Sequence, residues 1–210
     1  MNQAAGLFVY ALVALFVIID PIGTAVFFSA LTTGDTAEKR RVTARKATVI
    51  GFIVLSVFGL AGEALLRVLG ITIPALQIAG GALLFLSATD MVTARGELRA
   101  TDEEREAART SSEDISVFPL AIPFIAGPGA MTTMVLLHSK AVGQAGGIAV
   151  IELALGAIIL GTFIAMMGAR HLARLMGETG AHVIGRVLGI LLAALAAQFI
   201  IEGLRSALKL

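Results

Sequence analysis

The chain has 210 residues, of which 57% are hydrophobic and only 15% are charged, and its mean hydropathy is +0.91. Soluble domains carry roughly 45–50% apolar and about 25% charged residues, so this composition excludes a soluble globular protein. The net charge of +1 provides no basic field for nucleic acid, and the absence of cysteine excludes disulfides and thiolate metal sites. The sequence therefore predicts an integral membrane protein that binds no nucleic acid.

Six apolar runs are long enough to cross the roughly 30 Å of bilayer hydrocarbon as helices of about 20 residues. No basic residue precedes the first run, which favours a retained span over a cleaved signal peptide. A charged stretch divides the six runs into two sets of three. We expect a first unit at 1–94, a solvated linker at 95–116 and a second unit at 117–210. The expected spans are 6–31, 47–69, 74–94, 117–137, 146–168 and 184–207.

The distribution of Lys and Arg predicts the orientation of the chain in the membrane. Twelve of the sixteen fall in the first, third and fifth expected loops, and four fall on the opposite side. Cytoplasmic loops carry the excess of positive charge, so the odd-numbered loops should face the cytoplasm. Both termini should then lie on the outer face.

The two sets of spans resemble each other. A shift of 107 residues places Pro21 on Pro128 and Gly70 on Gly177. Each set begins with a span broken by Pro and Gly, continues with a plain span and ends with a Gly-containing one. Because each set has an odd number of spans, the second must be inverted in the membrane. The sequence predicts an all-α membrane protein of two inverted three-helix repeats with broken first and fourth helices, as in many secondary transporters.

The two predicted breaks are residues 20–24 (DPIGT) and 126–133 (AGPGAMTT). Proline removes a backbone N–H and clashes with the carbonyl four residues earlier, while glycine frees the backbone. Each segment also has the pattern of a new helix start. Asp20 or Gly127 would be the N-cap, followed by Pro21 or Pro128 at the first helical position.

Two half-helices that start near the membrane midplane favour a small zwitterionic ligand. Their free N–H groups and positive dipole ends suit a carboxylate, and the carbonyls that end the preceding half-helices suit an ammonium or a small cation. The surrounding Gly, Ala and Thr leave room for only a small side chain. The candidate substrate-binding residues are Asp20, Gly23, Thr24, Gly127, Gly129, Ala130, Thr132 and Thr133.

Several residues have more than one interpretation. A membrane proline can be a simple kink. Asp20 either caps its helix by accepting from the Gly23 N–H or is the site of a coupled proton or cation, since intramembrane carboxylates are costly and usually functional. Glu63, Glu152 and Glu202 read as interfacial residues near outer helix ends. The three histidines, His138, His171 and His182, lack metal-ligand spacing, so we expect no metal, no cofactor and no catalytic residues.

The chain resembles the MarC family of bacterial integral membrane proteins along its whole length. The resemblance rests on residues 20–23 (DPIG) with Phe27 and Phe28, 78–85 (IAGGALLF), 118–123 (FPLAIP) with 126–130 (AGPGA), and 189–203 with its Gln-Phe-Ile at 198–200. One departure is that Thr24 and Val26 stand where family members often have Asn and Pro. The resemblance implies a six-span protein of the bacterial cytoplasmic membrane, in a family in which some members transport glycine and alanine, with proton or sodium coupling.

These features predict a secondary transporter of a small neutral amino acid, coupled to an ion and not an enzyme. The alternatives are an exporter of another small solute or drug-like compound, and a membrane protein that transports nothing. An intramembrane enzyme would need a nucleophile with its base or a metal cluster within the spans, and the sequence shows neither. The substrate's identity, the direction of transport and the oligomeric state stay open at this point.

Overall fold

A computed structural model describes residues 3–93 and 114–208, and within these ranges the fold is helical without strands. Residues 95–113 of the predicted linker lie outside the described residues. The elements in chain order are α1 (Gln3–Ile19), α2 (Pro21–Leu31), α3 (Ala37–Val68), α4 (Ile73–Thr93), η1 (Ser116–Ile125), α6 (Pro128–Ala141), α7 (Gly147–Met167) and α8 (Ala169–Leu208).

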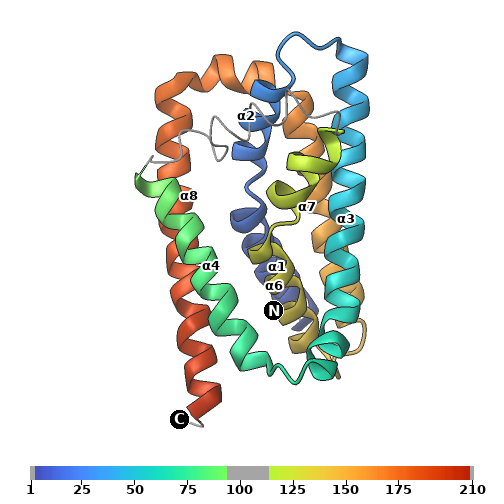
Figure 1. Ribbon diagram of the computed structural model, residues 1–210, viewed down its shortest axis with the longest axis vertical. Coiled ribbons are helices and arrows are strands. Elements are labelled where there is room, and N and C mark those ends of the chain that lie inside the picture. Colours follow the sequence, from blue (N-terminus) through green and yellow to red (C-terminus); the bar gives the residue numbers. More distant parts are fainter. Residues whose placement is uncertain (1–2, 94–113, 209–210) are drawn as a thin grey trace.

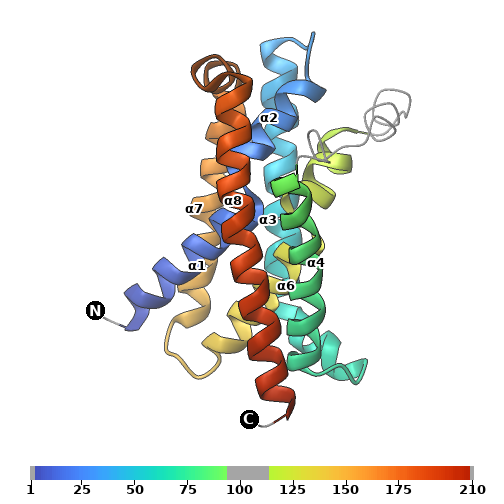
Figure 2. The same ribbon diagram turned by 90° about the vertical axis from the view of Figure 1, so that its left-hand side faces the viewer.

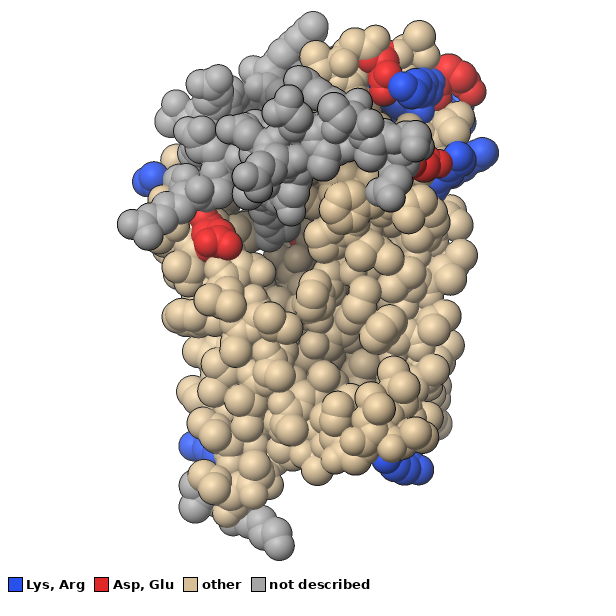
Figure 3. Space-filling view, in the orientation of Figure 1, with Lys and Arg blue, Asp and Glu red and all other residues tan. Residues whose placement is uncertain are grey.

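The described helices run back and forth along one long axis (Figures 1 and 2). Five spans are long and apolar enough to cross a membrane, the first being α1 and α2 together, and η1 with α6 makes a sixth if that pair, bent by 55°, is one span. The start of α1 and the end of α8 lie in the same half of the molecule, the lower half in Figure 1, and we call this end the terminal end. The connection between α2 and α3 lies at the other end, the distal end. On the face shown in Figure 3, the visible charged side chains gather toward the two ends and leave an uncharged belt between them.

Two expected boundaries are wrong. The second span was placed at 47–69, but α3 begins ten residues earlier because Thr36 caps it by accepting from the Lys39 N–H at 3.3 Å. The predicted loop between 168 and 184 is also helical, since α8 begins at Ala169. A search for apolar runs finds only the part of a helix that crosses the hydrocarbon. Helices α3 and α8 each begin before that part, in a charged segment.

Glycines allow close approach of α3 to the second broken span. A Cβ at Gly51 would overlap Ile125 of η1, and a Cβ at Gly62 would overlap Val135 of α6. Small residues at such interfaces let membrane helices pack at short range, where dispersion forces hold them together. Helix α3 therefore packs against η1, α6 and α7, while α4 lies along α8 and makes the most extensive helix pair (Figure 2).

Asp114 fixes the start of η1 at the distal end. Its Oδ1 accepts hydrogen bonds from the Ser116 hydroxyl at 2.7 Å and from the Ser116 N–H at 3.0 Å, and Lys46 of α3 donates to its Oδ2 at 3.0 Å. The Ser116 hydroxyl, and then Lys46, lower the pKa of the Asp114 carboxyl to about 2. The carboxylate thus stays charged and bonded at all physiological pH values.

We expect Gly62→Val to destabilise the protein. The added side chain must displace Val135 or separate α3 from α6, and overpacking of this kind costs about 1–3 kcal/mol. The matched control is Gly161→Val on α7, where a Cβ meets nothing within 4 Å. Thermal unfolding in detergent measures both variants. Equal unfolding temperatures for the two would contradict the close packing of α3 on α6.

Candidate functional site

The first broken span is interrupted at Asp20, which lies between α1 and α2. Asp20 is buried and has a left-handed backbone, with φ 48° and ψ 72°. Its Oδ1 accepts from the Gly23 N–H at 2.9 Å, which is the hydrogen bond that the capping interpretation requires. A Cβ on Gly23 would overlap the Asp20 carboxylate, so only glycine lets the carboxylate fold back over the helix start. The Thr24 hydroxyl donates to the Ile19 carbonyl at 3.0 Å and binds the end of α1 to the start of α2.

The second broken span is interrupted between η1 and α6. Gly127 is the N-cap of α6, with extended backbone at φ −77° and ψ 167°, and no side chain caps the helix. The Met131 N–H donates to the Gly127 carbonyl at 2.9 Å, but no described residue accepts from the N–H groups of Gly129 and Ala130. Two backbone donors at the start of α6 are therefore left for a ligand.

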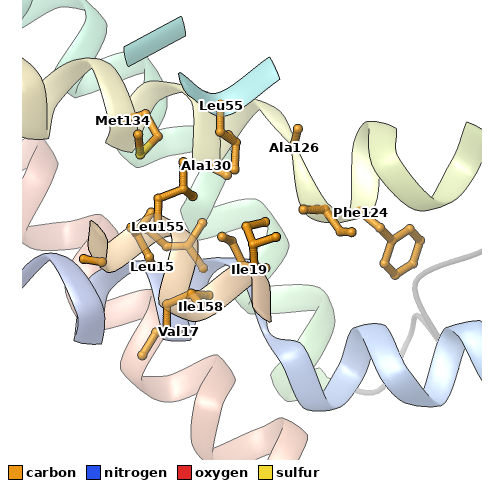
Figure 4. Close-up of a cluster of buried hydrophobic side chains, with 14 of the residues drawn as sticks. Leu15, Val17, Ile19, Leu55, Phe124, Ala126, Ala130, Met134, Leu155 and Ile158 are labelled. Atoms are coloured by element: carbon orange, nitrogen blue, oxygen red, sulfur yellow. The ribbon is translucent and has the colours of Figure 1, made fainter. Parts of the chain in front are cut away.

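The two breaks lie in one buried region. Ile19, which precedes Asp20, and Ala126, which precedes Gly127, belong to the same cluster of buried side chains (Figure 4). Phe27 of α2 stacks on Phe124 of η1, with ring centroids 3.8 Å apart, and α1 contacts α6. Helix α2 runs toward the distal end and α6 toward the terminal end (Figure 1). The positive ends of the two half-helices thus both face the middle of the molecule.

Each break also leaves a carbonyl without its helical partner. Pro21 and Pro128 have no N–H, so neither can donate to the carbonyl four residues earlier. These carbonyls are those of Val17 and Phe124, and no described backbone N–H replaces the missing donor at either. Carbonyl oxygens in this position can accept from an ammonium or a bound cation.

The remaining candidate residues divide between two faces of α6. Gly129 and Thr132 face α4: a Cβ on Gly129 would overlap Leu84, and Thr132 packs against Gly80. No described residue hydrogen-bonds the Thr132 hydroxyl. Ala130 and Thr133 are buried, and the Thr133 hydroxyl donates within the helix to the Gly129 carbonyl at 2.8 Å. Gly129 is thus also a packing residue. The Thr132 hydroxyl is the candidate side-chain donor without a partner among the described residues.

Three polar residues converge near the terminal end in a way that the sequence interpretation missed. His138 Nε2 of α6 lies 3.0 Å from Glu152 Oε1 of α7, and the Ser56 hydroxyl of α3 donates to Glu152 Oε2 at 2.6 Å. Glu152 was read as an interfacial residue, and no partner was expected for His138. Both residues lie close to the short connection between α6 and α7, and this shared position was the signal that could have paired them.

A second polar cluster links three helices at the same end. Glu202 of α8 accepts from Gln77 of α4 at 3.0 Å, from Lys140 of α6 at 3.2 Å and from Gln198 at 2.9 Å. The Lys140 ammonium also lies 5.5 Å from the centre of the Tyr10 ring on α1. Glu202 is therefore a cross-link between helices and does more than contact the membrane interface.

Comparison with known proteins agrees with this architecture. The profile described as "MarC family integral membrane protein" matches residues 5–208. A "UPF0056 membrane protein" of Aquifex aeolicus is 36% identical over all of this chain and 97% of its own length. "UPF0056 membrane protein YvbG" of Bacillus subtilis is 33% identical over 94% of this chain and 93% of its own, and "UPF0056 inner membrane protein YhgN" of Escherichia coli is 31% identical over 95% and 96%. No solved structure matches. The chain belongs to the MarC family of integral membrane proteins.

Proposed function

We propose that this protein is a secondary transporter of a small neutral amino acid such as glycine or alanine. The observation that carries the proposal is the pair of broken spans, with their half-helix starts in one buried region. At the start of α6, two N–H groups have no acceptor among the described residues. Interrupted helices of this kind form the substrate sites of many secondary transporters. Irregular backbone at membrane depth otherwise has no favourable environment, because lipid cannot satisfy it.

The chemistry of the breaks fits an amino-acid zwitterion. The N–H groups of Gly129 and Ala130, with the Thr132 hydroxyl nearby, would hold the carboxylate at the positive end of α6. The carbonyls of Val17 and Phe124 would accept from the ammonium. The apolar cluster beside the breaks, including Ile19, favours a substrate with a short apolar side chain or none.

The packing supports two inverted repeats. If α2 and α3 of the first half correspond to α6 and α7 of the second, the contact of α3 with α6 has its counterpart in that of α7 with α2. If α1 likewise corresponds to η1, the contact of α7 with α1 has its counterpart in the contact of α3 with η1. The remaining two helices, α4 and α8, correspond to each other and pack together. Such a relation would let the two halves exchange roles as the site opens to either side.

The orientation and the coupled ion are parts of the same proposal. The distal end carries Lys39, Arg41, Arg45 and Lys46, so it faces the cytoplasm by the distribution of positive charge, and both termini face outward. The relatives named as membrane proteins are consistent with a place in the bacterial cytoplasmic membrane. Asp20 stays a candidate for the coupled ion, although its Oδ1 is engaged as a helix cap.

Counterflow in proteoliposomes tests the function. Vesicles loaded with unlabelled alanine should take up labelled alanine or glycine to a saturable level, and protein-free vesicles should not. Leucine and phenylalanine should compete weakly, because we expect the Gly, Ala and Thr around the breaks to leave room for only a small side chain. Absence of saturable counterflow for every small neutral amino acid, with the protein folded in the vesicles, would refute the proposal. Counterflow of a different solute would instead support the exporter alternative.

Thr132→Val tests whether the start of α6 holds the carboxylate. The substitution keeps the bulk that packs on Gly80 and removes a hydroxyl that no described residue uses. A hydrogen bond to a charged group contributes about 1.5–3 kcal/mol, so the KM should rise about tenfold or more. Thr133→Val is the control, since its hydroxyl bonds within the helix. If both variants keep the wild-type KM, the substrate does not bind at this face of α6.

A further inference from the structure

The contact between His138 and Glu152 requires a hydrogen that neither group supplies in its usual state. His138 Nδ1 lies 2.9 Å from the Met134 carbonyl oxygen, which can only accept, so this contact is a hydrogen bond when Nδ1 carries the hydrogen. In a neutral imidazole with its hydrogen on Nδ1, the Nε2 atom has no hydrogen and carries a lone pair. Nε2 lies 3.0 Å from Glu152 Oε1, which in a carboxylate also carries lone pairs and no hydrogen. Both atoms are buried, and neither has another hydrogen-bond partner.

One additional proton resolves this conflict. If it resides on Nε2, the contact is an imidazolium–carboxylate ion pair; if it resides on Oε1, the carboxylic acid donates to a neutral imidazole. The contacts of His138 with Met134 and with Glu152 are both hydrogen bonds only when the pair holds one proton more than a neutral imidazole and a carboxylate. The Ser56 hydroxyl donates to the other carboxyl oxygen, which fixes Glu152 in place in both states.

The packing around His138 keeps this proton away from water. The His138 side chain is 6% exposed, and its ring lies against Gly59 of α3, where any Cβ would overlap it. Ser56 and Gly59 are three residues apart and thus share one face of α3. Glu152 is more open, with 23% of its side chain exposed.

The neighbouring charged groups already have partners. On α3, Glu63 pairs with Arg67 at 3.1 Å; on α6, Lys140 pairs with Glu202 of α8 and lies over the Tyr10 ring of α1. Glu152 is the only titratable residue of α7, and η1 has none. No other described charge is therefore in place to satisfy Nε2 and Oε1.

We propose that His138 and Glu152 form the proton-binding site through which transport is coupled to a proton gradient. The site joins α6, which begins at the substrate break, to α7, so loss of the proton leaves two opposed lone pairs and weakens the α6–α7 contact. The coupling rests on the proposed transport function, whereas the binding of the proton does not. In this proposal the coupled proton binds to Glu152 and His138, and Asp20 is the weaker candidate.

Glu152→Gln separates proton binding from structure. Its amide can donate to Nε2 and accept from Ser56, which keeps both contacts without a shared proton. Thermal unfolding in detergent should show the wild-type protein losing stability as the pH rises from mildly acidic to alkaline, because the stabilising proton is present at low pH and lost at high pH. Glu152→Gln should lack this loss, and the control Glu63→Gln, an exposed carboxylate, should keep it. If the unfolding temperatures of Glu152→Gln and wild type change with pH in the same way, His138 and Glu152 do not form the proton-binding site.

Proteoliposomes test the coupling. Wild-type protein should accumulate labelled alanine in response to an inward proton gradient. Glu152→Gln should lose this accumulation and retain counterflow, and Glu63→Gln should retain both. Gradient-driven accumulation by Glu152→Gln at the wild-type level would overturn the coupling while leaving transport intact. If the wild-type protein shows no counterflow at all, the transport proposal fails, and the unfolding curves alone decide whether His138 and Glu152 bind the proton.

Discussion

The need to satisfy backbone polar groups inside a membrane governs this structure. An uninterrupted helix satisfies every internal N–H and carbonyl by itself, and Pro21 and Pro128 prevent this in two spans. The first break is largely repaired within the protein, by the Asp20 carboxylate at the helix start and by the Thr24 hydroxyl at the preceding carbonyl. The second break is not repaired in this way, because Gly127 has no side chain. This difference between the breaks makes the start of α6 the stronger candidate for a binding site.

The rest of the fold holds the breaks in place. Helix α3 approaches η1 and α6 closely through its glycines, and α4 and α8 pack along each other beside them. Hydrophobic burial drives little association in lipid, so these contacts depend on shape and on the few polar links between helices. The links gather near the terminal end, where Glu152 connects α3, α6 and α7, and Glu202 connects α4, α6 and α8. Helix α6 takes part in both links, so in our proposal the helix that begins at the substrate site also carries the proton-binding His138 near its other end.

The sequence predicted the spans well because a 20-residue apolar run has few other interpretations. It also located both breaks, since Pro and Gly act on the backbone wherever they occur. It failed where the result depends on which helices become neighbours. The partner of His138 lies on another helix, and the close fit of Gly129 against Leu84 depends on the position of α4. Hydropathy also placed the starts of α3 and α8 too late, because each helix begins in a charged segment before it enters the hydrocarbon.

The central claim is that the N–H groups at the start of α6 bind the carboxylate of the transported solute. Pro128–Gly129 is the only Pro–Gly step in the sequence, so labelling proline carbonyl carbon with ¹³C and glycine nitrogen with ¹⁵N selects the Gly129 amide alone. Its signal can be followed by magnetic resonance in liposomes while alanine is added. The account predicts a shift of the amide signal that saturates over the same alanine concentrations as transport. An unchanged Gly129 signal at concentrations that saturate transport would contradict it.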